Sequence, residues 1–354
     1  MHETDLQLTP NEASDLSRVF DPDALARRGW DRAFVTVLDE TPAEECLALL
    51  VHDAGTELDT GWTAIRIPAK PTSAAGKTAD AEACAVRDGF VYVLGSQFGR
   101  KEGPLAARRS WIARVTEEAL GRAVDGGRAQ LEIVRLRFGL HRAVNDALAD
   151  AAVELLPLGP RSRAVYIDGT IALGAEKGKR WAGRVTSADH PINVEAAEFR
   201  ADGRLLLGLR YPTTAEGHPL LVELFDADTL FDGAEPRCGN VWVLENVGSA
   251  DAPAGLRGLE TRGDDRFDAI VGDLDAAGKS ATVLEDHPEG GNADSEHVRF
   301  RLPLTAGGGS VSCERVHHFG ALRRVEGVAV DLEGHAHYVI DEEGHVALRT
   351  LIFE

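Results

Sequence analysis

One short phrase recurs four times along the chain and restricts the possible folds more than any other feature. Each copy has a charged residue, a few small or apolar residues, a turn rich in Gly or Asp, and then an apolar run. This order predicts a β-hairpin, and hairpins that recur along a chain indicate a repeat architecture. The charged residues that open the copies, here called the anchor residues, are Glu82, Glu195, Arg257 and Glu326.

The spacing of the anchor residues predicts a β-propeller. The last two intervals are each roughly 65 residues and the first is about twice as long, which is near the length of a four-stranded blade or of two blades. We therefore expect a degenerate copy near residues 131–145, and a further unit ahead of Glu82 in the strands that follow Arg32. The fold class that we predict is all-β, a single propeller domain over residues 1–354 with six blades, five being the next choice. A pair of β-sandwiches is the structural alternative.

Helical signals are few in this chain. Residues 141–156 place Val144, Leu148, Ala152 and Leu155 on one face at helical spacing, which predicts a helical insertion. The short apolar run 164–167 is predicted to be a strand, like the other runs rich in β-branched residues.

Charge and composition exclude several classes of protein. The chain has 38 Lys and Arg against 58 Asp and Glu, a formal net charge of −20. Such a field repels phosphate backbones and attracts metal cations, so we expect no nucleic-acid partner. No apolar run approaches the roughly 18 residues of a membrane span, and no basic and then apolar signal region opens the sequence. We therefore expect a cytoplasmic protein without a membrane partner, whose four cysteines are buried small hydrophobic residues.

Hairpin geometry predicts that charged side chains meet at one mouth of the propeller channel. The anchor residues would form one ring there, and the residues at the ends of the return strands would form a second ring: Gln97, Arg210, Asp273 and Asp341. Carboxylates that converge with one or two arginines must form ion pairs, bind a cation or shift their pKa values. The alternative is structural, with each Glu accepting hydrogen bonds from neighbouring backbone N–H groups and closing its blade.

A metal site is the first functional expectation. Oxygen ligands suit Ca²⁺, which we favour, and Mg²⁺ better than Zn²⁺. The candidate ligands are Glu82, Glu195, Glu326, Asp273 and Asp341. A zinc site at His335 and His337, which share one face of a strand, is the less favoured option.

Residues near the second anchor complete the candidate site. His190 precedes Glu195 and is the candidate general base, with Glu195 as the second catalytic residue. Asn193 shares the face of Glu195 by period-two alternation. A basic segment that includes Arg100, Lys101, Arg108, Arg109 and Arg114 follows the first hairpin and suits an anionic ligand group, although it could equally be a solvated loop. The predicted substrate contacts are Asn193, Arg210, Arg257, Gln97, Arg100, Lys101 and Arg109.

The repeat phrases also resemble a known family. The stretches 91–96, 191–197, 205–210, 255–259 and 325–327 are similar, in order, to the DUF3616 family of uncharacterised proteins. The resemblance covers roughly residues 75–345, and residues 1–75 match nothing recognised. More distantly the chain resembles the propellers of esterase-like phytases and of gluconolactonase (SMP-30-like) enzymes, which implies a channel carboxylate that binds a divalent metal. Those families have Glu-Gly where Glu82 and Glu195 are followed by Ala, and only Glu326 keeps the Gly.

Together these observations predict a metal-dependent hydrolase, or a related enzyme, that acts on a small anionic ester, lactone or phosphoester at the channel mouth. Glu82, Glu195 and Glu326 would hold the cation, and Arg210 or Arg257 would clamp the anion. The alternative from another class is a non-catalytic binding or scaffold propeller, in which the channel charges neutralise one another. A ligand sensor or a tailoring enzyme of a biosynthetic pathway is a third reading that the sequence does not separate from the first.

Overall fold

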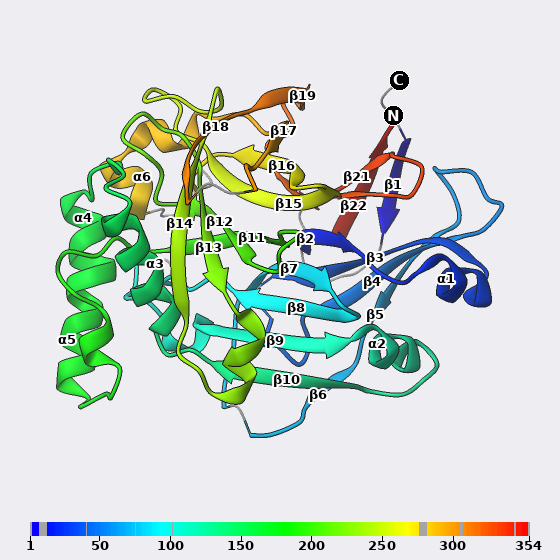
Figure 1. Ribbon diagram of the computed structural model, residues 1–354, viewed down its shortest axis with the longest axis horizontal. Helices are drawn as coiled ribbons and strands as arrows, with labels where there is room; N and C mark the ends of the chain where they lie inside the picture. Colours follow the sequence, from blue (N-terminus) through cyan, green and yellow to red (C-terminus); the bar gives the residue numbers. More distant parts are fainter. Residues whose placement is uncertain are drawn as a thin grey trace.

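Five β-sheets make up the part of the chain that the computed structural model describes, which is residues 2–6, 13–39, 41–74, 76–100, 102–275, 282–304, 307–342 and 345–352 (Figure 1). Blade 1 contains β2 (Ala13–Arg18), β3 (Trp30–Leu38), β4 (Leu47–Asp53) and β5 (Trp62–Arg66). Blade 2 contains β7 (Ala81–Arg87), β8 (Phe90–Gly95), β9 (Trp111–Thr116), β10 (Ala129–Arg135) and β6 (Ala69–Pro71).

The other three blades follow in chain order. Blade 3 contains β11 (Asn193–Phe199), β12 (Leu205–Tyr211), β13 (Leu220–Phe225), β14 (Arg237–Glu245) and β18 (Gly309–Ser312). Blade 4 contains β15 (Gly255–Gly263), β16 (Arg266–Gly272), β17 (Glu296–Arg301) and β19 (Glu314–His318). Blade 5 contains β20 (Val325–Val330), β21 (Ala336–Glu342), β22 (His345–Leu351) and β1 (His2–Leu6).

The first strand of each blade faces a common axis. Strands β2, β7, β11, β15 and β20 contact one another in that cyclic order, and β20 contacts β2 to close the circle. The predicted propeller is therefore confirmed, but the described residues form five blades and not six. The unit expected ahead of Glu82 is blade 1. The degenerate copy expected near 131–145 is wrong, because β10 and a helix occupy those residues.

Two strands join a blade that is remote from their own chain segment, and a third, β6, adds an outer strand to the blade that follows it. Strand β1 pairs antiparallel with β22, so the start of the chain supplies the outer strand of blade 5, and Figure 1 shows the two ends side by side. Strand β18 leaves the segment of blade 4 and pairs in parallel with β14 of blade 3, and β6 pairs in parallel with β10. These pairings tie the circle together and cover sheet edges.

A β-bulge marks the same point of every inner strand. The pairing register shifts by one residue at Asp15 in β2 and at each of the four anchor residues in the other inner strands. A bulge leaves one residue unpaired and re-aims its side chain. The repeated charge seen in the sequence is therefore the bulged residue of each inner strand.

Small residues follow the anchor residues because the inner strands approach closely. A Cβ added to Gly258 would lie 2.7 Å from the Cα of Gly327, and one added to Gly327 would lie 2.7 Å from the Cα of Asp15. Ala83 and Ala196 hold the same position in blades 2 and 3 and are fully buried. Packing at the axis thus explains the alternation of Gly and Ala after the anchors.

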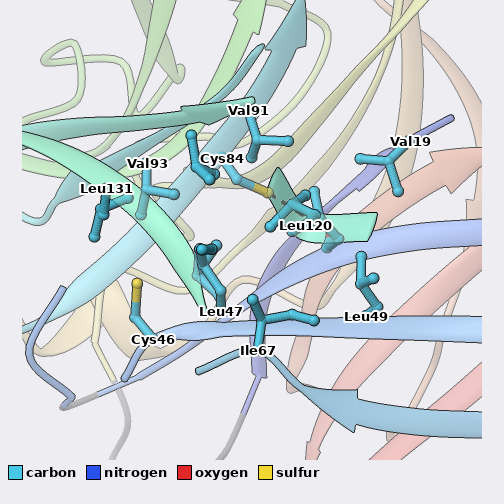
Figure 2. Close-up of a cluster of buried hydrophobic side chains, with 14 of the residues drawn as sticks. Val19, Cys46, Leu47, Leu49, Ile67, Cys84, Val91, Val93, Leu120 and Leu131 are labelled. Carbon is cyan, nitrogen blue, oxygen red and sulfur yellow. Dashed lines mark hydrogen bonds between the residues drawn. The ribbon is translucent and has the colours of Figure 1, made fainter. Parts of the chain in front are cut away.

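Hydrophobic side chains fill the spaces between blades. Figure 2 shows the cluster between blades 1 and 2, to which β4 contributes Leu47 and Leu49, β8 contributes Val93, and α2 (Glu117–Val124) contributes Leu120. Because both faces of a blade are covered, its strands are nearly continuous apolar runs. All four cysteines are free. Burial raises the thiol pKa of each cysteine, which agrees with the predicted role as small hydrophobic residues. Cys238 is the exception in accessibility, because it is only half-buried.

Helices decorate this framework. The predicted insertion corresponds to α3 (Gly139–Asp150), which buries Val144 and Leu148 and ends before Ala152, where φ is +51°. The run 164–167 is not a strand but part of the helical segment α4 (Pro160–Ser162), η2 (Arg163–Asp168) and α5 (Gly169–Glu176). Short apolar runs fit either structure, and here Pro160 at the first helical turn begins a helix.

The remaining helical elements are short: α1 (Pro22–Arg28), α6 (Thr282–Asp286), η1 (Ala107–Arg109), η3 (Ala182–Arg184), η4 (Ala227–Asp232) and η5 (Pro288–Gly291). Within the described ranges, none of the helices combines the length and the apolar character needed to cross a bilayer.

Candidate functional site

A cavity of about 490 Å³ lies at the end of the channel where the inner strands begin. Residues of blades 1 to 4 line it, together with Tyr166 of the helical segment. Its walls differ in chemistry. One wall carries carboxylates, one carries arginines from the loop between β8 and β9, and the third is the start of blade 3.

The carboxylate wall consists of Asp39, which follows β3, and Asp80 and Glu82 at the start of β7. One oxygen from each of the three lies within 4.8 Å of the other two, which is a separation that a shared cation can span. Arg109 Nη1 is 2.7 Å from Asp80 Oδ2, and the hydroxyl of Ser96 donates to the same carboxylate. Asp80 is therefore held in place by blade 2 itself.

Glu82 has a strongly perturbed acidity in this wall. Burial, followed by the charges of Asp39, Asp80 and Glu195, raises the pKa of Glu82 well above its usual value, against the opposing effect of Arg109. Ser14 donates a hydrogen bond of 3.2 Å to Glu82 Oε2. Carboxylates this close cannot all ionise without compensation, and among them Asp80 is paired with Arg109.

Beside this wall lies an ion-pair network that surrounds the axis. We call it the axial network, and its members are Glu195, Arg210, Arg257, Asp273 and Glu326. Arg210 Nη1 lies 2.9 Å from Glu195 Oε1, and Arg210 Nη2 lies 3.2 Å from Asp273 Oδ1. Arg257 Nη1 contacts both oxygens of Glu326, one at 2.6 Å, and Nη2 bonds Asp273. Its Nη1 also lies 4.0 Å from Glu195 Oε2.

The axial network explains the odd member of the repeat. Arg257 is the one cation among the anchors, and it binds the carboxylates of its neighbours. Burial alone would lower the pKa of Arg257, but Glu326, Asp273 and Glu195 together raise it well above its usual value. The structure thus brings three anchors into contact, with Arg210 and Asp273 level with them as the hairpin geometry predicts.

These contacts change the metal expectation. Glu195, Glu326 and Asp273 are engaged by arginines, whereas Glu82 stands with two carboxylates that the sequence did not single out. The side chain of Asp341 lies outside what the structure describes. The zinc alternative also finds no support at His337, because its two ring nitrogens are hydrogen-bonded to Asp331 and Thr350.

The arginine wall carries like charges in close proximity. Arg100, Arg108 and Arg109 all line the cavity. Burial, then the charges of Arg100 and Arg109, lowers the pKa of Arg108, with Asp80 opposing. The buried Nε atoms of Arg108 and Arg109 have no hydrogen-bond partner among the described residues. An anionic ligand group would relieve both the repulsion and the missing bonds.

Two other residues are expected beside this wall, Lys101 and Gln97. Lys101 lies outside the described residues. Gln97 is fully buried, and its Nε2 donates to the carbonyl of Gly95 at 2.8 Å, so it supports the loop from beneath and does not line the cavity.

The third wall is the start of blade 3. Asn193 and Tyr211 are opposite partners in the β11–β12 ladder, and both line the cavity. Asn193 Nδ2 donates to Glu195 Oε1 at 2.8 Å. The rings of Phe98 and Tyr166 lie 4.7 Å apart between centroids and add an aromatic surface.

His190 does not reach this cavity. Its backbone N–H donates to Asn145 of α3, and it is not among the residues that line the cavity. Burial lowers the pKa of His190, against a hydrogen bond to the backbone of Leu156. The general-base role expected for His190 therefore has no support from its position, which is away from the residues that line the cavity.

A second set of carboxylates lies on the inner strands: Asp15 at the bulge of β2, and Glu198 and Glu260, each three residues beyond an anchor, all almost fully buried. Asp15 Oδ2 accepts from the backbone N–H of Cys84 at 3.0 Å, and Glu198 Oε2 accepts from that of Thr261 at 3.2 Å. Each of these bonds joins one inner strand to the next. The structural role that we considered for the anchors is thus filled by Asp15, at the bulge of blade 1, and by Glu198 of blade 3. Burial is the main reason that the pKa of Glu198 is raised to about 7. Burial, and after it the charge of Glu198, raises the pKa of Glu260 above its usual value.

The sequence missed Asp39, Asp80, Tyr166 and Tyr211. Asp80 lies two residues before Glu82, directly ahead of β7, so its closeness to an anchor in sequence is the signal that could have found it. Tyr211 follows Arg210 at the end of the return strand of the second repeat, so the same hairpin geometry could have found it. Asp39 and Tyr166 reach the cavity from segments without a repeat signal.

Comparisons with known proteins find only a distant similarity to solved structures. No protein-family model and no curated protein matches the chain, so the resemblance to the DUF3616 family stays a prediction. Among solved structures, the chain is similar to a mannose phosphorylase from Leishmania mexicana, at 10% identity over 99% of this chain and 88% of that one, with a TM-score of 0.42. It is also similar to a GH43 endo-arabinanase from Bacillus licheniformis, at 12% identity over 98% of this chain and 97% of that one, with a TM-score of 0.41. A glucose dehydrogenase has 12% identity over 98% and 84% of the two chains and a TM-score of 0.35.

Proposed function

We propose that this protein is a hydrolase, or a related enzyme, that acts on a small anionic ester, lactone or phosphoester in the cavity at the channel mouth. The observation that carries the proposal is that one cavity holds a cluster of three carboxylates together with arginines, of which Arg108 and Arg109 have buried Nε atoms without a hydrogen-bond partner among the described residues. Asp39, Asp80 and Glu82 gather negative charge at one side, and Arg100 and Arg108 gather positive charge at another. A cation on one wall and a substrate anion on the other would satisfy both.

The carboxylate wall fits a divalent cation of the Ca²⁺ or Mg²⁺ class. All its donors are oxygens, which such ions require, and their separation within 4.8 Å suits a shared ion. Asp39, Asp80 and Glu82 would hold it. When bound, the cation would lower the pKa of a water ligand and polarise a substrate carbonyl or phosphoryl oxygen.

The chain's own residues have distinct parts in this proposal. Arg109 and Ser96 fix the carboxylate of Asp80, so that wall is organised before a ligand arrives. Arg100 and Arg108 bind and orient the anionic group. Glu195 lines the cavity and is fixed by Arg210 and Asn193, which makes it a rigid acceptor for the ligand.

The test of the cation is calorimetric titration of CaCl₂ and of MgCl₂ into chelator-treated protein. We expect one bound ion in the wild type, and at least about tenfold weaker binding in Glu82→Gln and Asp80→Asn, because each removes a charged ligand. Glu333→Gln is the matched control. Glu333 belongs to the other cluster of possible metal ligands among the described residues, which consists of Asp331, Glu333 and His335 and lies far along the chain. Equal affinities in all four proteins would contradict the proposed site.

The test of catalysis is hydrolysis of p-nitrophenyl acetate, p-nitrophenyl phosphate and an unsubstituted lactone, each with the cation and with chelator. We expect at least one substrate to be turned over only with the cation, and Arg108→Met to raise KM for an anionic substrate. Turnover that survives chelation would contradict the metal-dependent part.

A binding or scaffold propeller is the second candidate, because the axial network is neutralised internally to a large extent. That function predicts no ligand in the cavity. Thermal stabilisation by small anions that depends on Arg108 would contradict it.

A further inference from the structure

Two residues of blade 3 that line the cavity each carry a buried polar atom with no hydrogen-bond partner among the described residues. These atoms are Asn193 Oδ1 and Tyr211 Oη. Asn193 is 8% exposed and Tyr211 is 1% exposed, and both residues line the cavity. Buried polar groups in folded proteins are nearly always hydrogen-bonded, so each exception calls for an absent partner.

The chemistry of the missing partner follows from the bonds already made. Asn193 Nδ2 donates to Glu195, which fixes the orientation of the amide and identifies the unpaired atom as Oδ1, an acceptor. Only a hydrogen-bond donor can satisfy it. Tyr211 is the cross-strand partner of Asn193, so the two side chains share one face of the blade, and its phenol can donate to an oxygen or accept from a donor.

A hydroxyl group meets both needs, because it donates one hydrogen bond and accepts others. We infer that blade 3 forms a hydroxyl-recognition subsite, and that the ligand of this cavity is a hydroxylated anion, with its anionic group on Arg100 and Arg108 and a hydroxyl against Asn193 and Tyr211. This inference rests on the proposed function for the place of the ligand, but not for its turnover. Asn193 and Tyr211 are specificity-determining residues in this scheme.

The test compares two probes that differ in hydroxyl groups alone: glycerol 1-phosphate and propyl phosphate. Their affinities for the full-length protein are measured by calorimetry in calcium-containing buffer and again with chelator. The ratio of the two dissociation constants is the readout. Because a buried acceptor left unsatisfied costs about 1–3 kcal/mol, we expect glycerol 1-phosphate to bind roughly five- to 150-fold more tightly.

Three variants assign that ratio to residues. Asn193→Ala and Tyr211→Phe should each bring the ratio toward one, and Tyr211→Phe removes a single atom, so it serves if Asn193→Ala does not fold. Arg108→Met should weaken both probes by a similar factor and leave the ratio unchanged. Equal affinities in the wild type, or a preference that survives in both blade 3 variants, would overturn the inference. A protein that shows the preference without any cation-dependent turnover would instead refute the proposed function and leave the subsite in place.

Discussion

Replacing Arg257 with Met is the sharpest test of how the propeller holds its axis. The methionine keeps a long apolar stem of similar length and removes the guanidinium. Arg257 is 4% exposed and bonds Glu326 and Asp273, whose side chains are 12% and 9% exposed. The substitution therefore leaves two buried carboxylates without their closest cation.

The magnitude follows from what each carboxylate retains. Asp273 keeps Arg210 Nη2 at 3.2 Å, whereas among the described residues Glu326 forms an ion pair within 4.0 Å with Arg257 alone. Removing one partner of a buried pair costs about 3–5 kcal/mol, and the retained bond of Asp273 places this case near the lower end, at about 3 kcal/mol of unfolding free energy. Removing the charge of Glu326 as well should restore part of the loss. The double variant Arg257→Met/Glu326→Gln is thus expected to be more stable than Arg257→Met alone.

Equilibrium urea unfolding, followed by tryptophan fluorescence, measures these differences. Arg122→Met is the matched control, because Arg122 forms an exposed pair with Glu118 on α2, with side chains 57% and 80% exposed. Such a pair contributes about 0.3–0.5 kcal/mol. If Arg257→Met costs no more than Arg122→Met, or if the double variant is less stable than the single one, the axial network does not stabilise the fold as argued.

Three further outcomes follow from the structure. Glu260→Gln should match the wild type in stability near pH 4 and should exceed it increasingly as pH rises. The reason is that the folded pKa of Glu260 lies above its usual value, so deprotonation of the buried native group costs free energy. Urea unfolding across pH checks this, and a stability difference that does not change with pH would contradict it. Gly258→Ala should destabilise the protein by about 1–3 kcal/mol, since its Cβ would meet the backbone of Gly327. Gly183→Ala is the control, because a Cβ there meets nothing within 4 Å and φ is not positive; a loss at Gly258 no larger than at Gly183 would refute close approach at the axis. Calcium affinity should fall as pH is lowered, because protons compete for Glu82 with its raised pKa, and this pH dependence should flatten in Glu82→Gln; a wild-type affinity independent of pH would contradict that competition.

The repeat in the sequence predicted the architecture because every blade of a propeller has the same local requirement, a bulge and a close approach of its inner strand to the neighbouring inner strands. The charged residue followed by Ala or Gly marks the bulge and the close approach of inner strands, as at Arg257 and Gly258. The number of blades was not predicted correctly, because α3 and the helical segment 160–176 lengthen the interval between Glu82 and Glu195. An insertion and a missing repeat look alike in spacing alone.

The candidate site was predicted in part for a similar reason. Period-two alternation placed Asn193 beside Glu195, and hairpin geometry placed Arg210 level with it, as the contacts show. Partner choice depends on distances that a sequence does not encode, so the sequence did not reveal that Arg257 would bind Glu326. Asp39 and Tyr166 reach the cavity from a loop and a helix without any repeat signal.

The central claim is that Asp39, Asp80 and Glu82 bind a divalent cation in the cavity that they share with the arginine wall. Anomalous diffraction from crystals soaked in MnCl₂ tests this most directly, because it locates the ion. We predict a peak within coordination distance of carboxylate oxygens of these three residues, and its loss in Glu82→Gln. A protein with no peak there, or with its peak at the turn of Asp331, Glu333 and His335, would contradict the claim.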